Sequence, residues 1–431
     1  MTLHSMNRTI VATLVVSALS ISACSSNGTE ERGQETSSTA SETTSTSEPA
    51  TVTEDQGQAE TETEAVEVSS LSPRVILTHD KGLTTLDPET GEILEEIEKN
   101  AFLRLNQAGD GRHALVTEGN TLHAYDSGLI EKPHGDHSHF YETDPQLTNV
   151  TYDVPKAGHV VPHEGLTALF SDATGEVTVV KSHDIANSDA ETVVFDTGDP
   201  HHGVAIALED GSLIHTVGNE DERFTVRHSS AEGDTLAETT ECPKVHGEAV
   251  SENGFAFGCA DGPVLFKDGE FTKLHADGYQ RSGTLAGVDF SPIVLADLKK
   301  DEDAEKEHPT SVALIDTAEE SIREVELGSS YWFRSLGRGP SGEALVLTYD
   351  GNLTVIDQDS GEVTDRFPVI EPWEEKEEWQ EPGPILKTAG GLAYITDAEN
   401  QELVVVNLIN GEVEQRHQLD FAAVEMVVIA D

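Results

Sequence analysis

Histidines gather in one short stretch of this 431-residue chain, HGDHSHFY, at positions 134–141. Within six residues it holds His134, Asp136, His137 and His139. Neutral imidazole nitrogens and carboxylate oxygens are ligands that Zn²⁺ takes in proteins, usually four of them in a tetrahedron. Polar tracts also bind metals opportunistically, so the stretch gains meaning only if other histidines join it.

Three later segments repeat one arrangement, a histidine beside a glycine just before an apolar strand. They are VVPHEGLTALF, DPHHGVAIAL and CPKVHGEAVS, which supply His163, His201 with His202, and His246. Glycine lets the backbone approach closely, so equivalent junctions can bring imidazoles together. A single loop histidine is usually plain polar surface. Three recurring junctions, with His159 just before the first of them, indicate a shared metal site.

The elements that must position these histidines are short strands. From about Val75 onward, apolar runs alternate with Asp/Gly turns, as in EALVLTYDGNLTVIDQDSGEV and GLAYITDAENQELVVVNLINGEV. Repeats of roughly forty to fifty residues are typical of a β-propeller, and here they predict about eight blades, with seven as the alternative. The final strand, VEMVVIA, is expected to pair with the first strand near Val75 and close the ring. The alternative to this all-β propeller is a pair of β-sandwiches.

The N-terminal region has the composition of an export signal followed by a spacer. An apolar run, IVATLVVSALSISA, leads to Cys24, and its last residues resemble a lipobox. We expect residues 1–23 to be a lipoprotein signal peptide, Cys24 to be lipidated, and the protein to be anchored at the outer face of the cell membrane. An ordinary signal peptide is the alternative. The composition of residues 24–72 predicts a disordered acidic Ser/Thr/Glu tether. Residues 73–431 are expected to form the propeller domain.

Charge and cysteine content narrow the classes of partner and of site. The chain has 81 acidic and 26 basic residues and a formal net charge of -55, which excludes nucleic acid as a natural partner. Besides Cys24, the cysteines are Cys242 and Cys259. An oxidising compartment favours a disulfide between them over two free thiols or a thiolate metal site.

The histidine and cysteine segments, together with EPWEEKEEWQEPGPI, resemble the periplasmic zinc metallochaperones of the AztD family. The resemblance implies a β-propeller that binds Zn²⁺ and passes it to the solute-binding protein of an ABC zinc importer. It also implies a Cys242–Cys259 disulfide. The metal ligands that it implies come from His134, Asp136, His137, His163, His202 and His246, with His139, His159 and His201 as further candidates. The chain departs from the family because its tether lacks a His-rich segment.

These patterns predict an extracytoplasmic zinc metallochaperone that is a monomer and not an enzyme. One alternative is a propeller hydrolase or lactonase, whose channel metal would keep an open position beside an acid or base. The other is a purely protein-binding propeller, in which any metal is incidental. Neither a Gly-rich phosphate loop nor a GxSxG elbow stands out in the sequence.

Overall fold

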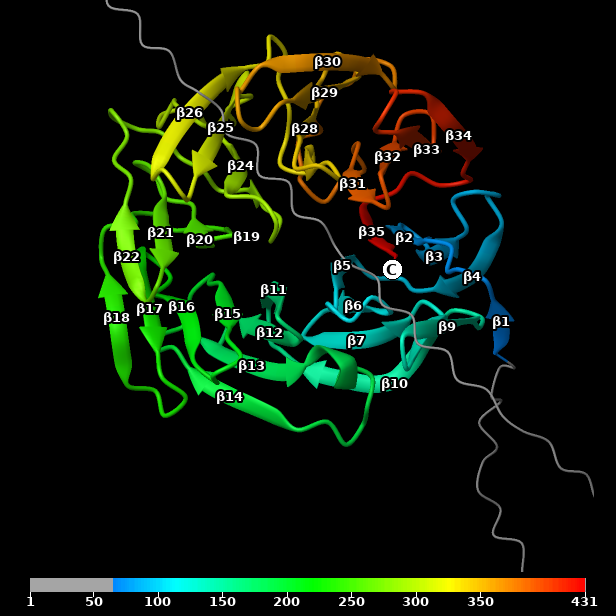
Figure 1. The fold of residues 1–431 in the computed structure, drawn as a ribbon, viewed down its shortest axis with the longest axis horizontal. Coiled ribbons are helices and arrows are strands. Elements are labelled where there is room, and N and C mark those ends of the chain that lie inside the picture. Colours follow the sequence, from blue (N-terminus) through cyan, green and yellow to red (C-terminus); the bar gives the residue numbers. More distant parts are fainter. Residues whose placement is uncertain (1–64, 431) are drawn as a thin grey trace, which may run out of the picture. The chain divides into compact units, whose positions relative to one another are not determined.

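Antiparallel strands make up the regular structure of the chain in this computed structural model, which describes residues 65–430 (Figure 1). The one helical turn among these residues is η1 (Ser182–Asp184). Nowhere in this range is a helix long and apolar enough to cross a membrane. The predicted signal peptide, Cys24 and the tether up to residue 64 lie outside the described residues. The predicted all-β class is confirmed.

Eight sheets have four strands each, and in Figure 1 one strand of each lies near the centre and one at the rim. From inner to outer strand, the first four sheets are β5 (Leu103–Gln107), β6 (His113–Glu118), β7 (Thr121–Asp126), β10 (Gln146–Asp153); β11 (Ala157–His163), β12 (Leu166–Ser171), β13 (Glu176–Lys181), β14 (Thr192–Asp196); β15 (Ala205–Ala207), β16 (Leu213–Gly218), β17 (Arg223–Ser229), β18 (Thr235–Thr239); and β19 (Glu248–Ser251), β20 (Gly254–Phe257), β21 (Val264–Lys267), β22 (Glu270–Lys273).

The remaining four-stranded sheets follow in chain order, and the last of them combines both ends of the described chain. They are β23 (Leu285–Ala286), β24 (Ile293–Asp297), β25 (Ser311–Asp316), β26 (Ser321–Glu326); β27 (Leu336–Arg338), β28 (Ala344–Leu347), β29 (Asn352–Ile356), β30 (Val363–Pro368); β31 (Leu386–Ala389), β32 (Leu392–Asp397), β33 (Glu402–Asn407), β34 (Val413–Gln418); and β35 (Glu425–Ile429), β2 (Arg74–His79), β3 (Gly82–Leu86), β4 (Ile93–Glu98).

The sheet formed by β35, β2, β3 and β4 joins strands from the two ends of the described chain. β35 pairs antiparallel with β2, with Ile76 opposite Val427 and Leu77 opposite Met426. Each sheet is buried on both faces by its neighbours. Leu77 packs in a core with Tyr394 of the preceding sheet, whereas Ile76 packs with Leu105 of the next one. Burial on both faces explains why the inner strands are continuous apolar runs rather than alternating patterns.

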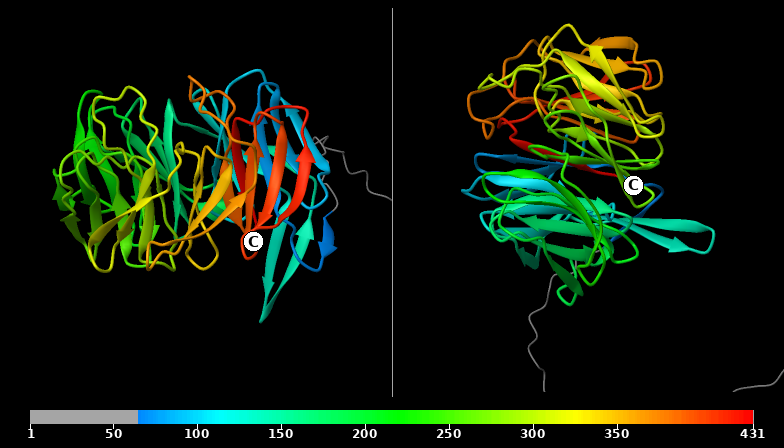
Figure 2. Two further views of the ribbon diagram at one scale, coloured as in Figure 1. Left: turned by 90° about the horizontal axis from the view of Figure 1, so that it is seen from above. Right: turned by 90° about the vertical axis from the view of Figure 1, so that its left-hand side faces the viewer.

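A ninth, three-stranded sheet consists of β1 (Val66–Val68), β9 (His137–Glu142) and β8 (Leu129–His134), in that order. The β8–β9 hairpin projects from the rest of the described strands (Figure 2). Residues 66–68 were predicted to belong to the disordered tether, but they form a strand against β9. β1 pairs with the backbone groups that β9 would otherwise leave free at the edge of the hairpin, and the alternating Val-Glu-Val sequence suits such an edge strand.

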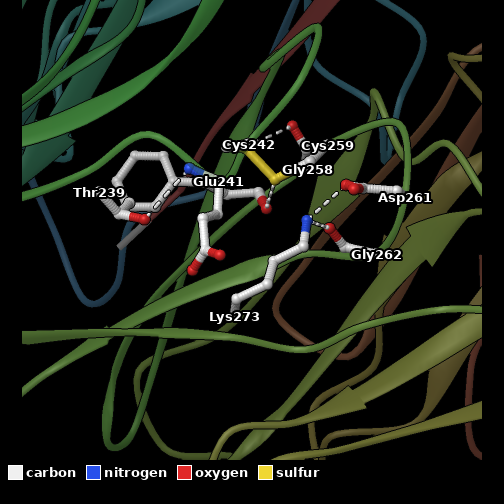
Figure 3. Close-up of a disulfide and its surroundings, with 9 residues drawn as sticks. Thr239, Glu241, Cys242, Gly258, Cys259, Asp261, Gly262 and Lys273 are labelled. Carbon is white, nitrogen blue, oxygen red and sulfur yellow. Dashed lines mark hydrogen bonds and ion pairs between the residues drawn. A yellow bond between two sulfur atoms is a disulfide. The ribbon is translucent and has the colours of Figure 1, made fainter.

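A disulfide joins Cys242 to Cys259, with 4.9 Å between the Cα atoms, and both side chains are fully buried (Figure 3). It ties the segment that precedes β19 to the residues that follow β20. Nearby, the Lys273 ammonium donates hydrogen bonds to Asp261 Oδ1 and to the Gly262 carbonyl. The bridge lies four positions from His246, so it restrains the segment that carries this imidazole.

Candidate metal centre

Three imidazoles from successive sheets meet in what we call the inner cluster, His159, His202 and His246. His159 lies on β11, His202 just before β15 and His246 just before β19. One potential ligand nitrogen from each lies within 4.8 Å of the other two. All three side chains are partly buried. Neighbouring inner strands and the segments that lead into them therefore bring together residues that are far apart in the sequence.

Hydrogen bonds orient two of these rings so that their Nε2 atoms are free. His202 Nδ1 lies 2.6 Å from Asp172 Oδ2, and His246 Nδ1 lies 2.6 Å from the Gly283 carbonyl oxygen. A carboxylate and a carbonyl accept hydrogen bonds, so the proton of each neutral ring lies on Nδ1. The two Nε2 lone pairs are then left to bind a metal.

The distance between these two nitrogens matches a zinc site. His202 Nε2 and His246 Nε2 are 3.2 Å apart. Zn–N bonds of about 2.0–2.1 Å in a tetrahedron place ligand nitrogens about 3.3 Å apart. Two lone pairs that face each other at this distance repel unless a proton or a cation lies between them. A divalent cation resolves the repulsion for both rings at once.

A glycine permits the backbone approach behind His246. Gly247 has φ +73, and a Cβ atom there would lie 2.6 Å from the Gly283 carbonyl oxygen. Gly283 is itself held because its N–H donates to the buried carboxylate of Asp297, at 2.6 Å. The His-Gly junction therefore lets the loop that carries His246 lie against the carbonyl that orients its ring.

The third histidine has a carboxylate beside it. Glu248 Oε2 lies 3.3 Å from His159 Nδ1, yet this oxygen is buried and makes no hydrogen bond within the described residues. A buried carboxylate oxygen without a partner is costly. A divalent cation in the inner cluster would offset that cost. Asp172 and Glu248 together carry the two negative charges that balance Zn²⁺.

Burial keeps His246 in the form that binds metal. Desolvation, followed by the neighbouring positive charge of His159 when protonated, lowers the pKa of His246 to about 3. Arg281 and His202 act in the same direction, and the Gly283 carbonyl opposes them. The ring is therefore neutral at neutral pH and need not lose a proton to bind zinc.

A second group, which we call the hairpin cluster, consists of His134, His137 and His139. His134 pairs with His137 across the β8–β9 turn, and His139 lies two residues further along β9, on the same face of the hairpin. The ring centroids are 5.0–5.6 Å apart, and one potential ligand atom from each ring lies within 4.8 Å of the others. Gly135, with φ +66, allows the tight turn that brings them together.

Carboxylates also accompany the hairpin cluster. His137 Nδ1 lies 3.2 Å from Asp136 Oδ1, and His139 Nδ1 lies 2.9 Å from Glu67 Oε1 of β1. His134 and His137 are exposed, in contrast to the partly buried inner cluster. The hairpin cluster is thus an accessible set of imidazoles, and its third member is oriented by the added strand.

The sequence led us to expect one site formed by HGDH together with His163, His202 and His246, and the structure shows two separate groups instead. His134, Asp136 and His137 lie on the hairpin. His163 belongs to neither group, since its ring packs edge-on against Phe255 with centroids 4.8 Å apart. Four strand positions, about 13 Å along an extended chain, separate His163 from His159, and His163 is in neither group of close potential ligands.

His201 is likewise outside both clusters. It is buried, and its ring nitrogens bond the Asp199 carbonyl and the Thr216 hydroxyl. Its neighbour His202 belongs to the inner cluster instead. His159, which the sequence gave as a further candidate, is a full member of the inner cluster. The sequence interpretation missed Asp172, which directly follows β12, and Glu248, although VHGE places Glu248 two residues after His246.

Comparison with known proteins finds relatives of this chain in sequence and in structure. No protein-family model matches the chain. The zinc chaperone AztD of Citrobacter koseri is 22% identical over 347 residues, which cover 77% of this chain and 80% of that relative. Two structures of C. koseri AztD, one of them the apo protein, give TM-scores of 0.72 and 0.71 at 20% identity, with 83% of this chain and 97% of theirs covered.

A more distant likeness is to dihydro-heme d1 dehydrogenase NirN, with a TM-score of 0.51 at 12% identity. It covers 82% of this chain and 74% of NirN, and it concerns the fold alone. The predicted resemblance to AztD is thereby confirmed: this chain is similar to AztD in sequence and shares its fold.

Proposed function

We propose that this protein is a zinc metallochaperone that binds Zn²⁺ at the inner cluster and delivers it to the solute-binding protein of an ABC zinc importer. The observation that carries the proposal is the pair of Nε2 atoms of His202 and His246, 3.2 Å apart and both oriented from behind. The likeness to the zinc chaperone AztD supports zinc as the metal.

The ligand chemistry suits transfer. Three imidazoles supply three nitrogens, which leaves the fourth tetrahedral position to Glu248 or to an incoming ligand of the recipient. Imidazole and carboxylate can be replaced one at a time as the recipient's ligands arrive. Asp172 and Glu248 each lie beside a histidine of the inner cluster. This placement favours holding a metal over activating water for hydrolysis.

The hairpin cluster supports a second zinc site in the same function. Its imidazoles lie on a projecting hairpin and are exposed, so they are accessible to zinc in solution and to a partner's ligands (Figure 2). We propose that this site captures or hands over zinc, and that the inner cluster stores it. The hairpin would then take the place of the His-rich segment that the tether lacks.

The remaining features of the proposal concern assembly and location. We propose a monomeric, closed eight-bladed propeller, which the eight four-stranded sheets and the β2–β35 pairing support. We also propose lipid anchoring through Cys24 at the outer face of the membrane, supported by the ISAC sequence. Substitution of Cys24 by Ala should then release the protein from the membrane fraction or stall its processing.

The test of function compares two rates. Zinc-loaded protein is mixed either with the metal-free solute-binding protein or with a chelator of matched affinity, and zinc release is followed by stopped flow. Direct handover predicts faster loss to the solute-binding protein than to the chelator. Equal rates would show that zinc simply dissociates, and would leave a zinc-binding protein that is not a donor.

A further inference from the structure

Positive charge is concentrated at one place on the inner strands of this acidic chain. Arg104 lies on β5, Lys387 on β31, and Glu425 on β35, which lies between those two strands in Figure 1. Arg334, from the segment before β27, donates to Glu425 Oε1 at 2.6 Å. Two guanidinium groups therefore lie within 4.0 Å of one carboxylate, with Lys387 on the neighbouring strand β31, in a protein whose net charge is -55.

Two of these cations lack an acceptor. Arg104 Nε is 4.0 Å from Glu425 Oε1, and this buried nitrogen makes no hydrogen bond within residues 65–430. Over the same range, the Lys387 ammonium has neither a hydrogen bond nor an ion pair. Lys387 is exposed to solvent, so its ammonium is open to a ligand. Glu425 already accepts a hydrogen bond from Arg334, so an added anion would give Arg104 and Lys387 a hydrogen-bond acceptor.

Aromatic rings surround the guanidinium groups. The Cζ atom of Arg104 lies 5.7 Å from the Trp379 ring centroid, and that of Arg334 lies 4.4 Å from the Phe333 centroid. Phe102 meets Trp379 edge-on at 5.4 Å. Phe102, Phe333 and Trp379 are 39–42% exposed, which is unusual for such large apolar side chains. Rings and cations together form a surface suited to an organic anion rather than to an inorganic one.

A hollow of about 710 Å³ adjoins this group, a size typical of small-molecule sites. Phe102 and Leu103, directly before Arg104, line it, as do Gln380 and Glu381, directly after Trp379. Phe421 and Val424 add apolar surface to the lining. Asp80, Glu381 and Asp420 also line the hollow with one cation, Lys81, so its lining is negative on balance and a carboxylate is favoured at the Arg104 end.

We propose that Arg104, Lys387 and Arg334 bind the carboxylate of an organic ligand, whose apolar part lies in the adjoining hollow against Phe102 and Trp379. The carboxylate belongs either to a free small acid or to a side chain of a polypeptide. Both sources present the same group to the cations, and the size of the remaining ligand distinguishes them.

Tryptophan fluorescence provides the test, since Trp379 is 42% exposed while Trp332 and Trp373 are 4% and 6% exposed. We would titrate full-length protein at constant ionic strength with 3-phenylpropionate, with N-acetyl-Phe-Glu-amide, and with uncharged 3-phenylpropionamide. Saturable binding of either carboxylate is expected, with little response to the uncharged amide. Tighter binding of 3-phenylpropionate indicates a free acid as the natural ligand, and tighter binding of the peptide indicates a polypeptide.

Variants separate a specific site from a change in folding. Arg104→Gln combined with Lys387→Met should weaken binding by roughly ten-fold or more. Glu425→Gln should tighten it, because the competing negative charge is removed while an acceptor for Arg334 remains. A misfolded variant would not bind more tightly. Arg227→Gln, at an ion pair with Glu238 between β17 and β18, is the matched control. Absence of saturable binding, equal binding of the uncharged amide, or unchanged affinity in the double variant overturns the proposal.

Discussion

The Nε2 atoms of His202 and His246 face each other at 3.2 Å, while the Nδ1 atom of each ring is held by an acceptor behind it. Two sequence segments 44 residues apart thus present two lone pairs to one point. The arrangement is preformed, so zinc binding requires little rotation of either ring. Preorganisation of this kind raises affinity because the ordering cost is met when the protein folds.

Removal of an inner-cluster histidine should weaken zinc binding strongly. For His202→Ala or His246→Ala we expect a loss of roughly a hundred-fold or more, because one of few ligands disappears. Competition with a chromogenic chelator measures the affinity. His228→Ala and His417→Ala are controls, since these rings bond Ser212 and the Pro88 carbonyl instead. His163→Ala, at a position predicted to bind metal from the sequence, should now behave like the controls.

The carboxylates behind the rings should have a smaller but clear effect. Asp172→Asn preserves the shape and removes the charge that orients His202, so a loss of about ten- to a hundred-fold in zinc affinity is expected. Glu248→Gln should act similarly through His159. Asp357→Asn, at a turn carboxylate that accepts hydrogen bonds from Ser360, serves as the matched control in the same assay. An affinity unchanged in both inner variants would argue against a metal at the inner cluster.

The hairpin should contribute a separate binding event. Calorimetric titration of the intact protein is expected to show two zinc ions per chain, the weaker one at the exposed hairpin. His137→Ala combined with His139→Ala should remove one of them and leave the affinity of the inner cluster unchanged. If this variant still binds two ions, or if it loses both, the two clusters are not independent sites.

Buried histidines should make the metal-free protein sensitive to acid. Burial lowers the pKa of His215 to about 4, against about 6.5 in an unfolded chain. Between these values the unfolded state binds a proton that the folded state does not, so the free energy of unfolding falls as pH falls through this window. The loss from this one residue is on the order of 3 kcal/mol.

Urea unfolding at a series of pH values, with chelator present, measures this loss. His215→Gln should flatten the dependence between pH 6.5 and 4, because one titrating group is removed. Replacement of His183, whose side chain is 70% exposed, is the control and should keep the wild-type slope. An identical slope in the His215 variant would contradict the prediction.

Much of the fold could be predicted because its signals are local. Asp/Gly turns between apolar runs, such as the YDGN turn before β29, identify strands and their period without knowledge of long-range contacts. The same holds for the His-Gly junctions, where Gly247 does let the backbone approach Gly283 closely. The pairing of Cys242 with Cys259 follows from how few cysteines the chain has.

The composition of each metal cluster was harder to predict, because it depends on the direction of side chains. His159 and His163 lie on one strand, and only the geometry across sheets decides which of them meets His202. The sequence likewise does not show that β8 and β9 form a hairpin outside the eight four-stranded sheets, which separates His134 from the inner cluster. Asp172 comes from a strand end that carries no histidine, so no motif pointed to it.

The pairing of β35 with β2 has a consequence for how the protein is made. The ribosome synthesises β35 (Glu425–Ile429) long after β2, so the sheet that contains β2, β3 and β4 lacks its inner strand until β35 has been made. Contacts this distant in the chain form slowly. This sheet of the nascent polypeptide therefore remains incomplete until β35 emerges, and a truncation before Glu425 would leave β2 without this partner.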